Sequence, residues 1–266
     1  MKSTLLLLGL NLLVLLFVGG VDTAQAQTSS PGATRARYQR FNTWAMVTSD
    51  ARISTKWGLH TESQLRQVQG PNAPQQKYLR IGANYHVANV LVLTTGYAYT
   101  MSFPDGNDSK TGSLPEHRSY QQLLLRFDSS RVMTQHRYRL EQRWVRRPGS
   151  QQFTYLNRLR YQLRLTLPLG PQRQITPGTA YLAGSDEVFI SFGRQATGNF
   201  FEQNRACLAL GYQVSRATSV EAGYMNQMAR PEEVGALAAT HILHLGLNFN
   251  PDFRKGRLTQ PIGVIE

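Results

Sequence analysis

The chain of 266 residues lacks the features that define several common classes of protein. Its one cysteine, Cys207, excludes an intramolecular disulfide framework, and it has no CxxC pair for zinc or redox chemistry. After residue 18 no window has the 18 or so uninterrupted apolar residues that a transmembrane helix requires. It also lacks a Ser-rich or Pro-rich linker and an internal repeat, so we expect one domain after the amino-terminal segment.

The amino-terminal segment has the pattern of a cleaved signal peptide. Lys2 precedes an apolar run from Leu5 to Val18, and the small-x-small sequence Ala24-Gln25-Ala26 follows. The run is too short and too poorly flanked for a retained membrane helix. We therefore expect a signal peptide over 1–26, a domain over 27–250 and a carboxy-terminal tail over 251–266.

Alternation is the main signal in the rest of the chain. In the segment 152–167, QFTYLNRLRYQLRLTL, nearly all odd positions are apolar, whereas Arg158, Arg160 and Arg164 are among the even ones. Such a strand has one apolar and one charged face, and many of them can close into a barrel with lipid outside and a polar lumen. A soluble barrel or sandwich has the same period with the apolar face turned inward. The strand length, about 16 residues and near 50 Å, favours the membrane.

The excess of basic residues fits a lumen better than nucleic acid. Lys and Arg number 29 against 16 Asp and Glu, which gives a formal net charge of +13. In a cytosolic protein this excess suggests nucleic acid. Here the arginines alternate along strands and the chain is expected to be exported, so we expect no nucleic-acid partner. A basic lumen or contact with anionic lipid head groups is the expected use.

The pattern predicts eleven strands, at 42–49, 51–67, 78–87, 90–101, 117–128, 132–147, 152–167, 187–193, 203–214, 220–224 and 243–249. Short turns are expected at Ser49-Asp50, Ala88-Asn89, Ser129-Ser130 and Ser215-Arg216, and long Gly/Pro-containing loops at 69–76, 102–115 and 229–240. Because short turns are periplasmic in transmembrane barrels, the first of these strands would run toward the periplasm. A chain delivered from the periplasm cannot begin with such a strand, so an earlier strand around 35–40 is expected. We predict an all-β, antiparallel, up-and-down transmembrane β-barrel of about 12 strands, with 10 as the alternative.

Six ordered blocks carry a family resemblance. They are PEHRSYQQLLLRF (115–127), HRYRLEQRWV (136–145), NRLRYQLRLTLPL (157–169), SDEVFISFG (185–193), FEQNRACLALGYQVS (201–215) and VEAGYMNQ (220–227). With them the chain resembles the Domain of Unknown Function 2490 family, uncharacterised, presumed outer-membrane β-barrels of Bacteroidetes-type Gram-negative bacteria. The resemblance covers about 44–250. It implies a fold and a location in the cell outer membrane, and it implies neither a reaction nor a ligand.

The inward charges form the main candidate site. The alternation predicts that arginines and glutamates share the lumen as a charge network. Its members are Arg137, Arg139, Arg143, Arg158, Arg160, Arg164, Arg205, Glu62, Glu141, Glu187 and Glu221. One interpretation is structural packing of a plugged lumen. The other is an anion-attracting pore or pocket, because rings of arginine select anions.

An enzyme is the third possibility that the sequence raises. His117 and Ser119 are two residues apart on one strand face, with Glu116 close by, and nucleophilic catalysis requires such groups within hydrogen-bond reach. No GxSxG or HExxH pattern supports this dyad. His241 and His244 are interpreted as ordinary strand residues and Cys207 as a small wall residue, so we expect no metal and no cofactor.

Together these patterns predict a porin-like outer-membrane barrel that is not an enzyme. The expected function is passive or gated passage of small anionic solutes. The alternatives are a lipid-modifying hydrolase of the outer membrane and a structural or surface-interaction barrel with a plugged lumen. The expected partners are outer-membrane lipid and lipopolysaccharide, together with small anionic solutes.

Overall fold

The alternating segments of the sequence are β-strands in the computed structural model. The structure describes residues 40–68, 74–103, 112–129, 131–193, 200–229 and 238–254. These residues hold eleven strands and no helix that is long and apolar enough to cross a membrane. The strands are β1 (Arg40–Arg52), β2 (Trp57–Val68), β3 (Pro74–Ala88), β4 (Leu91–Ser102), β5 (Leu114–Ser129), β6 (Val132–Arg146), β7 (Phe153–Pro168), β8 (Ala180–Phe192), β9 (Phe201–Gln213), β10 (Thr218–Ala229) and β11 (Ala238–Phe249).

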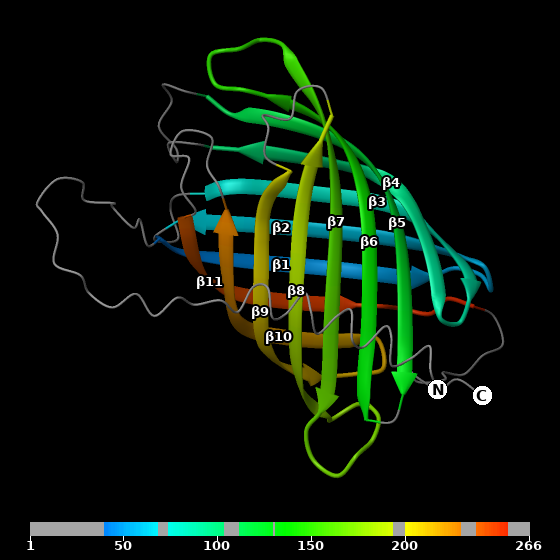
Figure 1. Ribbon diagram of the computed structural model, residues 1–266. Coiled ribbons are helices and arrows are strands. Elements are labelled where there is room, and N and C mark those ends of the chain that lie inside the picture. The colour runs from blue at the N-terminus through cyan, green and yellow to red at the C-terminus, as the bar shows by residue number, and fades with distance from the viewer. Residues whose placement is uncertain are drawn as a thin grey trace, which may run out of the picture. The chain divides into compact units, whose positions relative to one another are not determined.

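The eleven strands close into one barrel (Figure 1). Each strand pairs antiparallel with its neighbours in the sequence, and β1 closes the barrel by pairing parallel to β11 from Arg40↔Thr240 to Thr48↔Asn248. An odd number of up-and-down strands requires one such parallel pair. The prediction of an even, wholly antiparallel barrel is therefore wrong for the described strands. β1 pairs directly with β11, so no twelfth strand lies between them. The predicted signal peptide, 1–26, and residues 35–39 lie outside the described residues.

The connections differ in detail from the sequence prediction. Ser49 and Asp50 were expected to form a turn, but they lie inside β1, and the turn follows at residues 53–56. Asp50 is kept in the strand by its interior hydrogen bonds, because its carboxylate accepts from the Asn84 side chain at 2.9 Å and lies 2.8 Å from His60 Nδ1. The β7–β8 connection spans residues 169–179, so long connections occur at both ends of the barrel.

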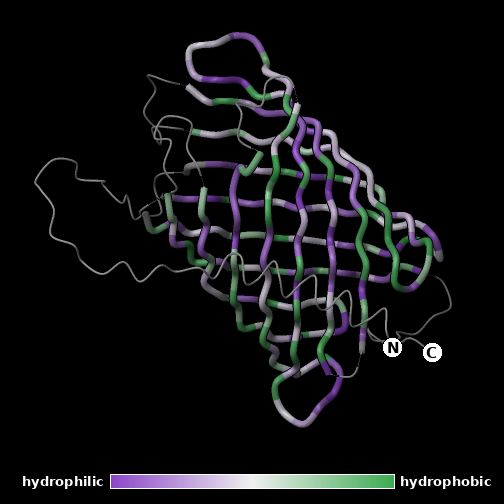
Figure 2. Tube along the Cα trace, in the orientation of Figure 1, coloured by the Kyte–Doolittle hydropathy of each residue, from purple (hydrophilic) through white to green (hydrophobic). Residues whose placement is uncertain are grey.

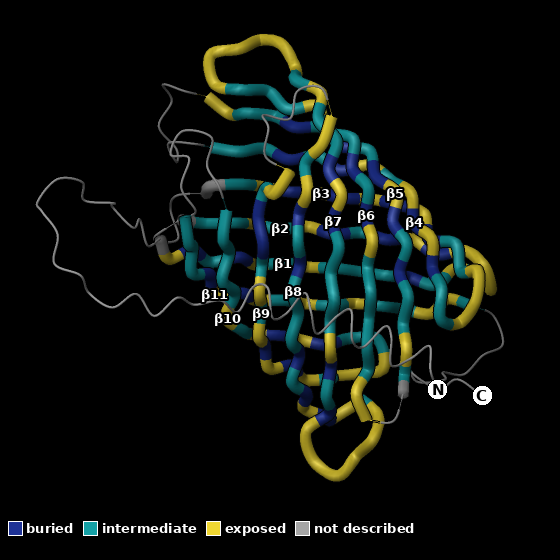
Figure 3. Tube along the Cα trace, viewed as in Figure 1, coloured by how far each residue is buried: buried dark blue, intermediate teal, exposed yellow. Residues whose placement is uncertain are grey.

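The strands have two chemically different faces. Figure 2 shows polar and apolar residues alternating along each strand, and Figure 3 shows burial alternating with the same period. Most large apolar side chains of the strands point outward and are exposed, with Leu79 at 60%, Leu208 at 57% and Leu243 at 51%. Charged side chains point inward and are buried, with Arg80 at 2% and Arg139 at 1%. This is the inverse of a water-soluble protein, in which apolar side chains fill the interior.

Two facing glycines make room for an interior tyrosine. Gly82 of β3 is paired with Gly96 of β4, and a Cβ atom at either position would collide with the Tyr120 ring or its hydroxyl. The Tyr120 ring is thus fully buried against the inner wall. The guanidinium carbons of Arg80 and Arg139 lie 4.9 and 5.4 Å from its centroid. The aromatic face favours these cations electrostatically and helps to position them in the lumen.

Candidate functional site: the charged lumen

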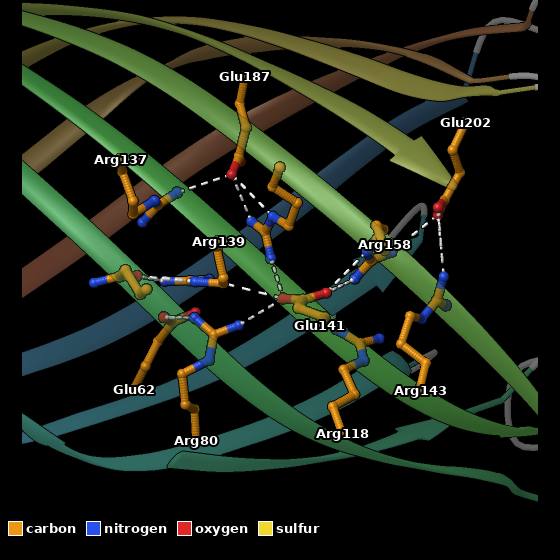
Figure 4. A network of polar contacts seen from close by, with 12 residues as sticks. Glu62, Arg80, Arg118, Arg137, Arg139, Glu141, Arg143, Arg158, Glu187 and Glu202 are labelled. Atoms are coloured by element: carbon orange, nitrogen blue, oxygen red, sulfur yellow. Dashed lines mark hydrogen bonds and ion pairs between the residues drawn. The ribbon is translucent and has the colours of Figure 1, made fainter. Parts of the chain in front are cut away.

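Glu141 on β6 is the centre of an ion-pair network inside the barrel (Figure 4). Its carboxylate lies 2.5 Å from Arg158 Nη2, 2.9 Å from Arg160 Nη1 and 3.4 Å from Arg80 Nη2. The Arg158 contact is a fork, since Nε also donates to the same oxygen at 2.8 Å. The Glu141 side chain is 1% exposed. Such a buried carboxylate is tolerated only when several hydrogen-bonded cations surround it, which is the arrangement seen here.

Two further carboxylates extend the network across the lumen. Glu62 on β2 lies 2.6 Å from Arg80 Nη1, and Glu187 on β8 lies 2.8 Å from Arg160 Nη2 and 2.9 Å from Arg137 Nη2. Arg80 and Arg160 each connect Glu141 to another carboxylate. A continuous chain of charges therefore runs from β2 to β8 through the middle of the barrel (Figure 4).

A second group of ion pairs lies nearer the strand ends that lead to residues 104–111 and 194–199. Glu116 at the start of β5 contacts Arg118 at 2.6 Å and Arg143 at 2.5 Å. Glu202 on β9 contacts Arg158 at 2.9 Å and Arg143 at 3.4 Å. Because Arg158 also binds Glu141, this group is continuous with the central network.

The structure places all eleven residues of the predicted lumen network on the inner face. Ten of them form ion pairs with described partners, and these include Arg164 with Glu221 at 2.6 Å. Tyr181 donates a further hydrogen bond to Glu221 at 2.9 Å. The exception is Arg205, whose Nε donates to the Gln227 side chain instead of a carboxylate.

Sequence reasoning missed four members of the network. Arg80, Arg118 and Glu116 occupy inward positions of the same alternation, so a complete count of each strand face finds them. Glu202 could not be found in this way. The β8–β9 register shifts between Phe189 and Ile190, so β9 has one extra residue at this point. The Glu202 side chain therefore points inward although the alternation along β9 would point it outward. Such β-bulges re-aim individual side chains.

Side chains close the lumen at the level of Glu141. Five large residues of the interior are less than 2% exposed, and they come from strands on different sides of the barrel: Arg80, Tyr120, Arg139, Glu141 and Phe189. Three cations contact the Phe189 ring, with Arg160 Cζ at 4.5 Å, Arg205 Cζ at 4.6 Å and Arg158 Cζ at 5.4 Å from its centroid. These five side chains leave almost none of their own surface accessible, and this packed layer is called the closed level.

A cavity of about 410 Å³ lies on one side of the closed level. Its rim includes Gln76, Ser102 and Thr240, at strand ends, and its floor includes Arg80 and Arg160. Seven arginines and three glutamates line it, so the formal charge of the lining is seven minus three, or +4. This volume lies within the usual range for small-molecule sites.

The two residues considered for catalysis lie on the outer face. His117 Nδ1 shares a hydrogen bond of 2.5 Å with the Tyr97 hydroxyl, and Ser119 Oγ donates to the Gln142 side chain at 2.7 Å. Among the described residues, no hydrogen bond joins His117 and Ser119. Glu116 is on the opposite face, paired with Arg118. The barrel wall therefore separates the orienting acid that the hypothesis requires from the nucleophile and the base, and these two are hydrogen-bonded to other residues.

Other reactive residues are dispersed. Cys207 is a free thiol of intermediate exposure in β9. His241 shares a hydrogen bond of 2.5 Å with the Tyr224 hydroxyl on the outside, whereas His244 is buried inside. Within the described residues no group of three or more His, Cys, Asp or Glu could hold a metal ion.

The fold and the lumen together define a closed all-β barrel with a charge-filled interior. A family model described as "Protein of unknown function (DUF2490)" matches residues 41–234, and the chain belongs to this family. The chain is also 31% identical over 189 residues to an uncharacterized protein of Methylorubrum extorquens, a match that covers 70% of this chain and 77% of that protein. No solved structure matches the chain.

Proposed function

We propose that the chain is an integral barrel of a bacterial outer membrane that is closed at rest and allows gated passage of small anionic solutes. The observation that carries the location is the inverted wall, with exposed apolar side chains outside and buried ion pairs inside. In water this outer surface would be unfavourable, whereas lipid is its natural solvent.

Aromatic side chains at the strand ends support the same location. Transmembrane barrels place aromatic residues at both membrane interfaces. Outward aromatics occur near one end of the barrel at Phe41, Trp144, Phe153 and Phe201, and near the other at Trp57, Phe127, Tyr212 and Phe249. Between them the exposed outer side chains include Leu79, Ile81 and Leu159, together with the tyrosines Tyr97 and Tyr138.

The filled lumen supports gated rather than free passage. The closed level is made of ion pairs and cation–aromatic contacts, which can exchange partners without breaking a backbone hydrogen bond. The surplus of arginine favours anions over cations along this route. The same closure also favours a second function, that of a structural or surface-interaction barrel with a permanently plugged lumen.

Cell fractionation and gel mobility test the proposed location. We expect the mature chain in the outer-membrane fraction, beginning at Gln27, and faster migration of the unheated than the heated protein in detergent gels. A Leu79→Asp/Leu208→Asp variant should fail to assemble, while a Leu79→Ile/Leu208→Ile control should assemble normally. Recovery of the folded wild-type protein as a soluble periplasmic protein would contradict the proposal.

A further inference from the structure

Two arginines in the cavity have no carboxylate partner. Arg66 on β2 donates to the amide oxygens of Gln64 and Gln76, and Arg205 on β9 donates through Nε to Gln227. Among the described residues neither arginine forms an ion pair, although every other arginine of the cavity lining does. Amide oxygens satisfy hydrogen-bond donors but leave the positive charge uncompensated.

Both uncompensated cations contact the same aromatic ring. Arg66 Cζ lies 4.0 Å and Arg205 Cζ 4.8 Å from the centroid of Trp44, which is 7% exposed. The two guanidinium carbons are therefore at most 8.8 Å apart, the sum of these distances. Like charges this close in a partly desolvated cavity repel each other, and an anion that binds both would offset the repulsion.

The surroundings define the chemistry of that anion. A guanidinium binds carboxylate or phosphate through paired hydrogen bonds of about 2.8 Å. The terminal nitrogens of Arg205 have no hydrogen bond to a described residue, and they are not buried, so they remain available as donors. The lining charge of +4 attracts anions, and the volume of about 410 Å³ admits a small solute.

We propose that Arg66 and Arg205, held against Trp44, form a binding site for a small oxyanion, either a carboxylate or a phosphate. This inference rests on the proposed passage of anions. It identifies the site at which an entering solute is first bound. A solute bound there shares the cavity with Arg160, which forms an ion pair with Glu141.

Tryptophan fluorescence of the refolded full-length mature barrel in detergent tests this site. Trp57→Phe and Trp144→Phe leave Trp44 as the only tryptophan, so the signal comes from the site itself. Inorganic phosphate and succinate are the probes, and succinamide is the neutral control. We expect saturable quenching by at least one oxyanion and none by succinamide.

Matched substitutions separate a specific site from a general charge effect. Arg66→Gln and Arg205→Gln should each raise the dissociation constant at least tenfold, whereas Arg216→Gln, in the exposed β9–β10 turn, should change it less than twofold. If Arg205→Gln does not fold, Arg205→Lys keeps the charge and should still weaken binding measurably, because it loses the fork. Heated and unheated gel mobility reports folding for every variant.

Two results would overturn the inference. One is the absence of saturable quenching by either oxyanion, and the other is equal weakening by Arg216→Gln and Arg205→Gln. This assay requires a folded barrel but neither a membrane nor conduction. Failure of the oxyanion site is therefore distinguishable from failure of the proposed location or of gated passage.

Discussion

At the scale of single residues, Glu141 is the residue on which most of the interior depends. Replacing it by glutamine keeps its shape but removes the charge that balances Arg158, Arg160 and Arg80. Breaking a buried ion pair by removing one partner costs about 3–5 kcal/mol. Each of these three arginines keeps a second carboxylate, and Arg139, 4.0 Å from Glu141, keeps its hydrogen bonds to Gln122. We therefore expect the lower end, a loss of about 3 kcal/mol in the free energy of unfolding.

Glu202→Gln is the matched control for that prediction. Glu202 also pairs with Arg158, but its side chain is 27% exposed against 1% for Glu141. Water can solvate the arginine that is left behind, so we expect less than half the loss. Urea titration of the refolded barrel measures both variants. Equal losses would show that burial does not set the strength of this network.

At the scale of the element, substitutions in β7 test which solvent surrounds the outer face and how deep each side chain lies in the membrane. Leu159 and Leu165 have similar outward exposures of 39% and 43%, but Leu159 is near the middle of the strand and Leu165 near its end. In lipid, arginine on the outer face costs about 2–4 kcal/mol at the midplane and about 0–1 near an interface. We therefore expect Leu159→Arg to destabilise the barrel in vesicles much more than Leu165→Arg. Similar small effects of both would indicate an aqueous outer face.

The same element explains what the sequence could predict. In β7 a period of two, repeated over 16 residues, determines which side chain points inward, and this was enough to place Arg158, Arg160 and Glu187 of β8 together. That period does not indicate which two strands pair to close the barrel or where the register between two strands shifts. The parallel β1–β11 pair and the bulge that turns Glu202 inward depend on contacts between strands, so the sequence left them undetermined.

At the scale of the whole molecule, closure of the lumen decides whether the barrel conducts. Wild-type protein in planar bilayers should give no steady open conductance, because Arg80, Glu141 and their neighbours fill the interior. Arg80→Ala/Glu141→Ala removes a charge pair together with its bulk and should open a conducting path. The remaining arginines should make that conductance favour anions.

The control for conduction is Arg164→Ala/Glu221→Ala, which removes an equally balanced pair away from the closed level. Its arginine is 26% exposed, and neither residue lines the cavity. This variant should remain closed, since the Glu141 network is intact. A steady open conductance in the wild-type protein would contradict closure at rest, and cation preference in the opened variant would contradict an anion route. Only closure in the wild type and the control, combined with anion preference in the opened variant, assigns the gate to the ion-pair layer.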